Sequence, residues 1–248
     1  MGIVIKTDSQ ISIMRKAGRI CADVHELLAK YIRPGITTNE LNRIAEDYIR
    51  SNDASPSFLG YRGFPAAVCT SINEEVIHGI PSERKLKSGD IVSIDVGVCY
   101  KRFHGDAART HTVGKISDIH KKLIEVTQNS FFEGISHAKS GNRLHEISNA
   151  IQNYVDAFGF SVVREWCGHG IGQQLHEDPQ VPHTRQEKRG PKLEAGMTLA
   201  IEPMINVGSH VLNIKSDTWT VFTRDGKYSA HYENTVLITD GEPEILTL

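Results

Sequence analysis

Hydrophobic residues recur at intervals of three and four in four stretches of the chain, which is the spacing of an amphipathic helix. The first stretch, residues 14–31, ends before Pro34-Gly35, and the second follows Thr37-Thr38-Asn39-Glu40, which fits a capping box. Two further stretches cover about residues 117–137 and 144–158, with Ser140-Gly141 between them. The pattern predicts two pairs of helices, one pair in each half of the chain.

Apolar runs typical of strands follow each helix pair. They cover residues 66–72, 91–100, 105–113, 161–164, 198–207, 212–223 and 231–239. The polar pair Lys101-Arg102 separates two of these runs and predicts a hairpin. The order helix, helix, strands occurs twice, and the repeats meet near residue 115. We therefore predict an α+β fold, with an antiparallel sheet and helices packed on its outside. One domain would cover residues 1–248, with pseudo-two-fold halves of about 1–115 and 116–248.

Acidic residues interrupt the apolar strand patterns at four places. Asp95 lies in the middle of one strand of the predicted hairpin. If the turn is centred near Tyr100-Lys101, Asp106 lies at nearly the same distance from that centre as Asp95. A regular hairpin would make them cross-strand neighbours. Glu202 and Glu233 interrupt two strands of the second half. Buried carboxylates are costly unless they are paired or bind a metal, and two close carboxylates repel. The alternative to a metal site is that Asp106 belongs to a polar turn and that the other acids each form a separate buried ion pair.

A glycine-rich segment, Cys167-Gly168-His169-Gly170-Ile171-Gly172, adds a nitrogen donor. Alternating glycines would let the backbone turn tightly and expose His169. The spacing differs from the G-x-G-x-x-G pattern of phosphate loops. An oxygen-rich set with one imidazole also differs from a structural zinc site, which favours cysteine. The combination is typical of an open site for two metal ions that activate a water, so we expect a metallohydrolase.

Composition excludes several other classes. The chain has 28 lysines and arginines against 30 aspartates and glutamates, so no basic excess indicates nucleic acid. No apolar run is long enough to span a membrane, and the N-terminus does not resemble a signal peptide. The four cysteines are widely spaced and form no C-x-x-C pair. We expect reduced thiols and a cytoplasmic protein.

Several short motifs together indicate a family. They are Ser71-Ile72-Asn73-Glu74 before His78-Gly79-Ile80-Pro81, Asp95-Val96-Gly97, Gly105-Asp106, Gly168-His169-Gly170-Ile171-Gly172 with His176-Glu177, Ile201-Glu202-Pro203, and Trp219 with Glu233-Asn234-Thr235. Over essentially its whole length the chain resembles the pita-bread (creatinase-like) metallopeptidases. Among them it is most similar to the bacterial type I methionine aminopeptidases. The resemblance implies a pita-bread fold and removal of the initiator methionine from nascent proteins when the second residue is small.

The resemblance also implies a role for each candidate ligand. Two divalent ions (Co, Mn, Fe or Zn) would be bound, one of them chelated by Asp95. Asp106 and Glu233 would bridge the two ions. His169 and Glu202 would complete the coordination of the ion that Asp95 does not bind. Glu202 would also transfer the proton, first as general base and then as general acid.

Two further histidines and an apolar pocket would contact the substrate. His176 would stabilise the tetrahedral intermediate, and His78 would lie near the scissile amide nitrogen. The alternative for both is a loop histidine that binds water. The methionine pocket would include Tyr61, Cys69, Trp219, Phe58, Phe64 and Leu175. The last three stand where relatives often have Cys, Tyr and Phe, but they keep the pocket hydrophobic.

The expected partners are the N-termini of nascent polypeptides at the ribosome. We expect no binding to nucleic acid or to a membrane, and we expect the enzyme to be a monomer. Two other functions remain open. One is an X-Pro-directed peptidase of the same fold, whose relatives usually carry an extra N-terminal domain. The other is a pita-bread binding module without catalysis, which would typically have lost metal ligands. All five ligands are present here.

Overall fold

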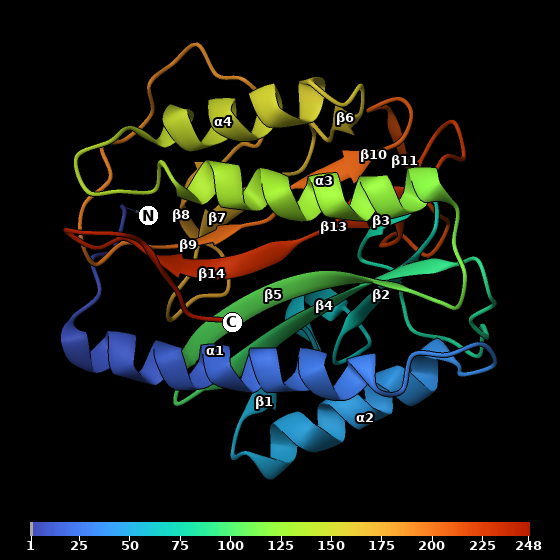
Figure 1. The fold of residues 1–248 in the computed structure, drawn as a ribbon. Coiled ribbons are helices and arrows are strands. Elements are labelled where there is room, and N and C mark those ends of the chain that lie inside the picture. The colour runs from blue at the N-terminus through green and yellow to red at the C-terminus, as the bar shows by residue number, and fades with distance from the viewer. Residues whose placement is uncertain (1) are drawn as a thin grey trace.

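Four long helices and a set of short strands form the structure, a computed structural model that describes residues 2–248 (Figure 1). The helices are α1 (Asp8–Ala29), α2 (Thr38–Ser51), α3 (Asp118–Ile135) and α4 (Leu144–Asp156), with a short 3₁₀ helix, η1 (Tyr61–Gly63). The side chains of Thr7, Thr37 and Ser117 cap the first three helices by accepting a backbone N–H from the first turn. The two predicted helix pairs are therefore present.

The largest sheet has nine strands, in the order β1-β4-β5-β14-β9-β7-β8, with β2 also paired to β4 and β15 to β14. Two three-stranded sheets, β13-β10-β6 and β11-β12-β3, complete the structure. All the strand pairs are antiparallel, as predicted. The strands are β1 (Ser55–Pro56), β2 (Cys69–Ile72), β3 (Glu75–Ile77), β4 (Ile91–Tyr100), β5 (Phe103–Thr112), β6 (Ser161–Val162), β7 (Gly168–Gly170), β8 (Glu177–Val181), β9 (Thr198–Ile201), β10 (Met204–Asn206), β11 (Leu212–Ile214), β12 (Val221–Thr223), β13 (Ser229–His231), β14 (Glu233–Leu237) and β15 (Glu244–Ile245).

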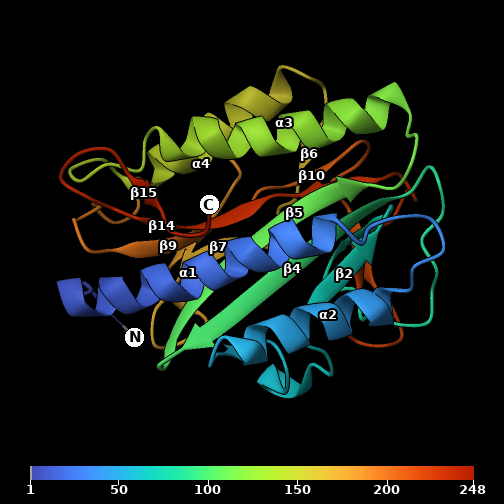
Figure 2. The same cartoon turned by 60° about the horizontal axis from the view of Figure 1, so that its bottom comes forward.

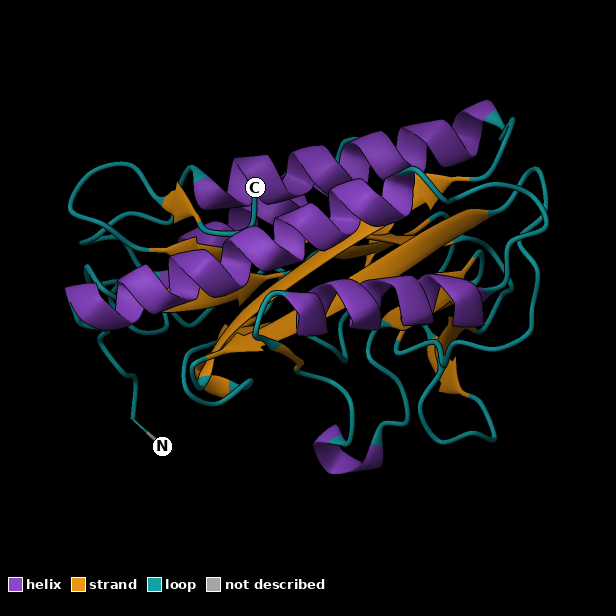
Figure 3. Ribbon diagram, turned by 90° about the horizontal axis from the view of Figure 1, so that it is seen from below, coloured by secondary structure: helices purple, strands orange, loops and turns teal. Residues whose placement is uncertain are grey.

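The long helices cover one side of the curved sheet, as Figures 2 and 3 show for α1, α2 and α3. Ile94 and Val96 of β4 pack against α1 and α2 in one core cluster. Leu199 and Ile201 of β9 join Phe131 of α3 in a second cluster. Because side chains alternate along a strand, the residues between these apolar ones point to the opposite side of the sheet. That opposite side carries the candidate site.

The hairpin β4–β5 turns at Lys101-Arg102, whose φ angles of 46° and 68° are those of a tight hairpin turn. This register pairs Asp95 with Ala108, and Asp106 with Gly97. The two aspartates are therefore cross-strand neighbours, as predicted, but the register places them two residues away from being directly opposite. They are diagonal neighbours on one face, because the turn lies one residue later in the sequence than its predicted centre.

Two predicted strands are interrupted where the chain passes from one sheet to another. The run 198–207 breaks at Glu202-Pro203, between β9 in the large sheet and β10 in a small one. The run 231–239 breaks at Tyr232, between β13 and β14, and the N–H of Tyr232 donates to the Pro203 carbonyl. Proline cannot donate a ladder hydrogen bond, which favours the break. Both acids of the second half thus lie where the chain changes sheets.

Three other predicted runs are shorter or divided. The run 66–72 is a strand only over Cys69–Ile72, and 161–164 only over Ser161–Val162. The run 212–223 is a hairpin of two short strands, β11 and β12. No helix within residues 2–248 is both long and apolar enough to cross a membrane.

Candidate active site

A single pocket brings together every residue that the sequence singled out. Its cavity volume is about 220 Å³, and it lies on the side of the sheet away from α1 and α2. The predicted residues that line it are Phe58, Tyr61, Phe64, Cys69, His78, Asp95, Asp106, His169, Leu175, His176, Glu202, Trp219 and Glu233. Because these residues come from both halves of the chain, the pocket forms only when the two halves are joined through β5 and β14.

Four carboxylates form one end of this pocket. Burial raises the pKa of Asp95 to about 7. Burial also raises the pKa of Asp106 and of Glu233. Repulsion from Glu233 and Asp95 adds to the rise for Asp106, and repulsion from Glu202 and Asp95 adds to it for Glu233. The pKa of Glu202 is raised by burial and by the two aspartates. Without a cation, these groups would therefore resist ionisation at neutral pH.

Several of these acid oxygens have no hydrogen-bond donor within the described residues. Asp95 Oδ1, Asp106 Oδ1 and Glu233 Oε1 are buried and unpaired. A buried polar atom without a partner is costly. One set of atoms from Asp106, His169 and Glu233 lies within 4.8 Å of one another, as ligands of one ion would. Unpaired oxygens and a carboxylate–imidazole donor set both fit divalent metal ions.

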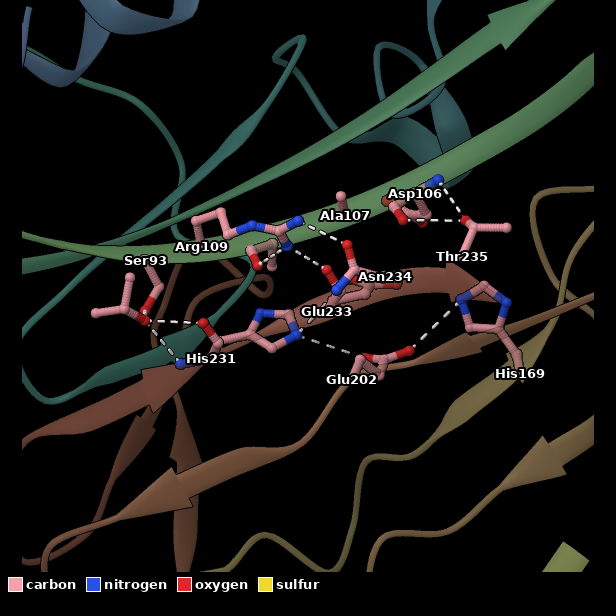
Figure 4. A network of polar contacts seen from close by, with 12 residues as sticks. Ser93, Asp106, Ala107, Arg109, His169, Glu202, His231, Glu233, Asn234 and Thr235 are labelled. Atoms are coloured by element: carbon pink, nitrogen blue, oxygen red, sulfur yellow. Dashed lines mark hydrogen bonds and ion pairs between the residues drawn. The ribbon is translucent and has the colours of Figure 1, made fainter. Parts of the chain in front are cut away.

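His169 presents one nitrogen to this cluster (Figure 4). Its Nδ1 lies 2.8 Å from the Gly170 carbonyl oxygen, so Nδ1 carries the proton that is donated there. The other nitrogen, Nε2, lies 3.5 Å from Glu202 Oε1. A hydrogen bond that fixes the tautomer in this way is common for metal-binding histidines, because it leaves Nε2 free to bind the ion.

The glycines beside His169 do not form the exposed turn that the sequence suggested. Residues 168–170 are strand β7, and His169 is buried. A Cβ atom at Gly168 would lie 2.2 Å from the Ala200 carbonyl oxygen, and one at Gly170 would lie 2.1 Å from that of Asp178. Glycine is needed because the neighbouring backbones approach closely, and this approach places the imidazole among the acids.

The other end of the pocket is apolar. Phe58, Phe64, Cys69 and Leu175 are buried, and the edge of Phe64 meets the Trp219 ring at a centroid distance of 5.2 Å. A Cβ atom at Gly97 would lie 2.6 Å from the Phe58 ring. The small residue beside Asp95 therefore makes room for an aromatic wall close to the acids.

His78 and His176 lie at the boundary between the two ends. His176 Nδ1 is 2.9 Å from the Tyr61 hydroxyl, and the two rings stack. His78 adopts a left-handed backbone, with φ of 58°, and its ring meets the Trp166 ring edge-on at 5.0 Å. Burial lowers the pKa of His78 to about 4, so this imidazole is neutral at physiological pH.

Sequence reasoning missed several residues of the site. Arg62, Trp166, Ile214 and Thr218 also line the pocket. His183 Nε2 accepts the Glu202 backbone N–H at 3.1 Å, and His231 Nε2 lies 3.9 Å from Glu202 Oε2. These residues lie in irregular segments or at strand ends, where the apolar pattern gives little signal. For His231, the sequence offers two cues, the alternation of β13 and the position of Glu233 two residues further on.

His25 lies on helix α1 but does not face solvent. It is buried under the sheet, and its Nε2 donates to the Ala107 carbonyl oxygen at 2.9 Å. His25 lies on α1, directly beneath β5. Its side chain therefore satisfies a polar atom of the sheet rather than contacting water.

Comparison of the sequence with known proteins distinguishes between the functional classes that this geometry permits. Residues 12–240 match the model of a protein family described as "Metallopeptidase family M24". The chain is also 58% identical over 246 residues to a methionine aminopeptidase of Clostridium perfringens, with 99% of each chain covered. The chain belongs to the methionine aminopeptidases of metallopeptidase family M24.

Solved structures agree on the fold. The chain superposes on a methionine aminopeptidase of Thermotoga maritima with a TM-score of 0.97 and 43% identity, covering 99% of both chains. A prolidase of Pyrococcus horikoshii is also similar, with a TM-score of 0.81, but it is only 24% identical. The present chain covers 63% of that prolidase, so this second likeness shows the fold alone. The pita-bread fold and the metallopeptidase class predicted from the sequence are confirmed.

Proposed function

We propose that two divalent metal ions bind Asp95, Asp106, His169, Glu202 and Glu233, and that this centre cleaves the bond after the initiator methionine. Removal of that residue is the reaction of a methionine aminopeptidase. The observation that carries the ligand assignment is the set of buried, unpaired oxygens on Asp95, Asp106 and Glu233 beside the free Nε2 of His169. When bound, the ions (Co, Mn, Fe or Zn) would supply Lewis-acid activation of the attacking water and the scissile carbonyl.

Glu202 is the proton carrier in this proposal. Its carboxylate borders the pocket and lies between His169 and His231 (Figure 4). Burial raises its pKa, and this brings the affinity of the carboxylate for a proton toward the working pH. Glu202 takes a proton from the attacking water and returns it to the leaving amine nitrogen.

His176 stabilises the oxygen on which negative charge develops. In this proposal the Tyr61 hydroxyl, 2.9 Å from Nδ1 of His176, donates to that nitrogen, so the neutral imidazole carries its proton on Nε2. That N–H then donates to the carbonyl oxygen of the substrate, and the bond strengthens as the carbonyl becomes tetrahedral. His78 lies across the pocket beside Trp166 and Trp219 and contacts the amide nitrogen of the cleaved bond.

The apolar end selects the side chain. The whole pocket, including its acidic end, measures about 220 Å³, which is below the roughly 300 Å³ of the smallest pockets for drug-sized ligands, so its apolar end suits a single side chain. Phe58, Phe64, Cys69, Leu175, Tyr61 and Trp219 form its walls. Their soft, apolar surface suits the thioether of methionine.

The cellular setting is also part of the proposal. Residues 1–248 act as one catalytic domain, and the halves of about 1–115 and 116–248 both contribute ligands. The enzyme works as a monomer in the cytoplasm, on nascent polypeptide N-termini at the ribosome. Four free thiols, Cys21, Cys69, Cys99 and Cys167, suit a reducing compartment.

The test is an assay of metal-free protein reconstituted separately with Mn²⁺, Fe²⁺, Co²⁺ and Zn²⁺. Met-Ala-Ser should be hydrolysed only after metal is added, and Leu-Ala-Ser and an X-Pro peptide should not be cleaved appreciably. Preferred cleavage of the X-Pro peptide would replace the proposal with a proline-directed peptidase. Absence of both cleavage and metal uptake would indicate a binding module.

A further inference from the structure

A buried ion pair joins the N-terminal segment to the loop that carries His176. The segment, residues 2–7, precedes α1 and lies beside β8 (Figure 1). Nζ of Lys6 lies 2.7 Å from Oε2 of Glu177, the first residue of β8, and the two side chains are 2% and 8% exposed. Lysine and glutamate are almost never buried except in pairs, so each of these side chains depends on the other.

Lys6 is fixed through both its backbone and its side chain. Its N–H donates to the Gly196 carbonyl oxygen at 2.8 Å, in the segment before β9. Its Nζ also donates to the Val4 carbonyl oxygen at 3.2 Å. The next residue, Thr7, is the N-cap of α1. The ammonium group is therefore held by the large sheet and the first helix, and not only by the loop that it contacts.

Glu177 connects this anchor to the loop of residues 171–176, which has no regular secondary structure. Its other oxygen, Oε1, accepts the Gln174 backbone N–H at 3.0 Å. A Cβ atom at Gly172 would lie 2.6 Å from Glu177 Oε1 and 2.6 Å from Cε of Lys6. The backbone of the loop therefore closes directly over the ion pair. One carboxylate oxygen is engaged by the ammonium group and the other by the loop.

The side chain that depends on this closure is His176, the residue just before Glu177. Leu175 is held independently, because it is buried in an apolar cluster. His176 is exposed, and its ring lies against two other rings, at centroid distances of 5.3 Å from Tyr61 and 4.2 Å from His169. A small movement of the loop would therefore redirect Nε2 of His176 without opening the apolar end of the pocket.

Stability alone does not account for the pair. The cost of removing two charges from water offsets much of their attraction, so apolar side chains of similar size often stabilise a protein equally well. What the charged pair adds is a defined geometry, because the Lys6 ammonium and the Gln174 N–H each engage one oxygen of Glu177. Geometry matters here because a misplacement of about 1 Å in a catalytic group can cost 10²-fold in rate.

We propose that Lys6 is a positioning residue for catalysis. Through Glu177 it holds the loop so that the Nε2 proton of His176 points at the carbonyl oxygen of the substrate. The inference rests on the proposed function, because it assumes that His176 stabilises the developing negative charge. Lys6 does not line the pocket, so its effect on the reaction passes through the loop. The N-terminal segment thereby becomes part of what sets the rate.

The experiment measures kcat and KM for Met-Ala-Ser with full-length, metal-loaded variants. Lys6→Met keeps the apolar stem and removes the ammonium group. We expect kcat to fall about tenfold, with KM within about twofold of the wild-type value. In a His176→Ala background the same substitution should lower kcat no further, because the group that Lys6 positions is absent. Arg15→Met, which removes a cation from the exposed pair with Glu244, is the control and should keep the wild-type kcat.

Two further variants separate positioning from stability. Lys6→Met combined with Glu177→Leu leaves no unpaired buried charge, so it should fold as stably as the wild type and still show the loss of kcat. Glu177→Gln keeps the shape of the side chain and removes only its charge, so its loss of kcat should be smaller. Urea unfolding measures the stability of each variant, and kcat is expressed per folded molecule.

The outcomes separate this inference from the proposed function. A wild-type kcat in folded Lys6→Met, or in the variant that replaces both partners, would overturn the inference and leave the proposed function standing. An equal loss of kcat with and without His176 would do the same, because it would make the pair purely structural. A metal-loaded wild type that does not hydrolyse Met-Ala-Ser would overturn both. If Lys6→Met does not fold, the paired variant and Glu177→Gln decide the question.

Discussion

The two faces of the nine-stranded sheet are built from adjacent residues and behave in opposite ways. On β4, Ile94 and Val96 point toward α1 and α2 and are fully buried among apolar neighbours. Asp95, between them, points to the pocket with a buried oxygen that has no donor. The two apolar side chains on the helix face are packed entirely by other protein atoms. The pocket face is completed only by something that the chain does not supply.

This difference separates stability from activity. Apolar burial contributes roughly 25 cal/mol per Å² on the helix face, and nothing there requires a ligand. On the pocket face, close carboxylates raise one another's pKa and destabilise the folded protein when they ionise. Substitutions on the helix face should therefore lower stability, whereas substitutions on the pocket face should lower activity.

The largest effect is expected for Glu202→Gln. The amide has nearly the same shape but cannot carry the proton, so kcat should fall by about 10³ or more. The metal-free variant should be at least as stable as the wild type, because burial raises the pKa of Glu202 and an ionised carboxylate is unfavourable there. Kinetics with Met-Ala-Ser and urea unfolding measure the two quantities. Wild-type-like turnover would remove Glu202 from the mechanism.

The next effect concerns the helix face. Ile94→Ala leaves a cavity in a fully buried site and should lower the free energy of unfolding by about 2–5 kcal/mol. Because the side chain points away from the pocket, kcat per folded molecule should stay near the wild-type value. Asp95→Asn is the matched variant in the same strand, and it should lose metal affinity with little loss of stability. If both variants had the same profile, the two faces would not be functionally separate.

A smaller effect is expected for His176→Ala. Loss of one donor to the developing negative charge should lower kcat about 10²-fold, with little change in KM. Tyr61→Phe is the graded control, because it removes only the hydroxyl that orients Nδ1. Its loss should be several-fold smaller. A change confined to KM in the alanine variant would instead make His176 a binding residue.

The smallest effect is a pH dependence of stability that comes from the helix face. Burial lowers the pKa of His25 well below 6.5, and Arg109 adds to the shift. Below pH 6.5 the unfolded chain binds a proton that the folded one does not. Stability is therefore lost as the pH falls, by up to about 1.4 kcal/mol per pH unit from this group.

His25→Gln should remove that part of the pH dependence. Urea unfolding of both proteins at several pH values between 7 and 5 compares the slopes. Identical slopes would show that His25 does not contribute, and that the acid sensitivity belongs to the histidines of the pocket face.

Much of the site was predictable because buried acids are unusual in apolar strands. Asp95, Asp106, Glu202 and Glu233 are visible in the one-dimensional pattern, and helices α1 to α4 follow from spacing and capping residues. The short motifs then identified the family. The register of the hairpin was less accessible, because a shift of one residue at the turn moves the cross-strand partner by two.

By itself, the sequence determined the helix pairs, the antiparallel sheet and the acids that demand a cation, since each depends on local periodicity or on the cost of burying a charge. The tertiary structure decided what lies around those acids. Close backbone approach made Gly168 and Gly170 necessary, and the change of sheets at Pro203 and Tyr232 brought His231 against Glu202 and Glu233. Such contacts join residues far apart in the chain, and no local pattern encodes them.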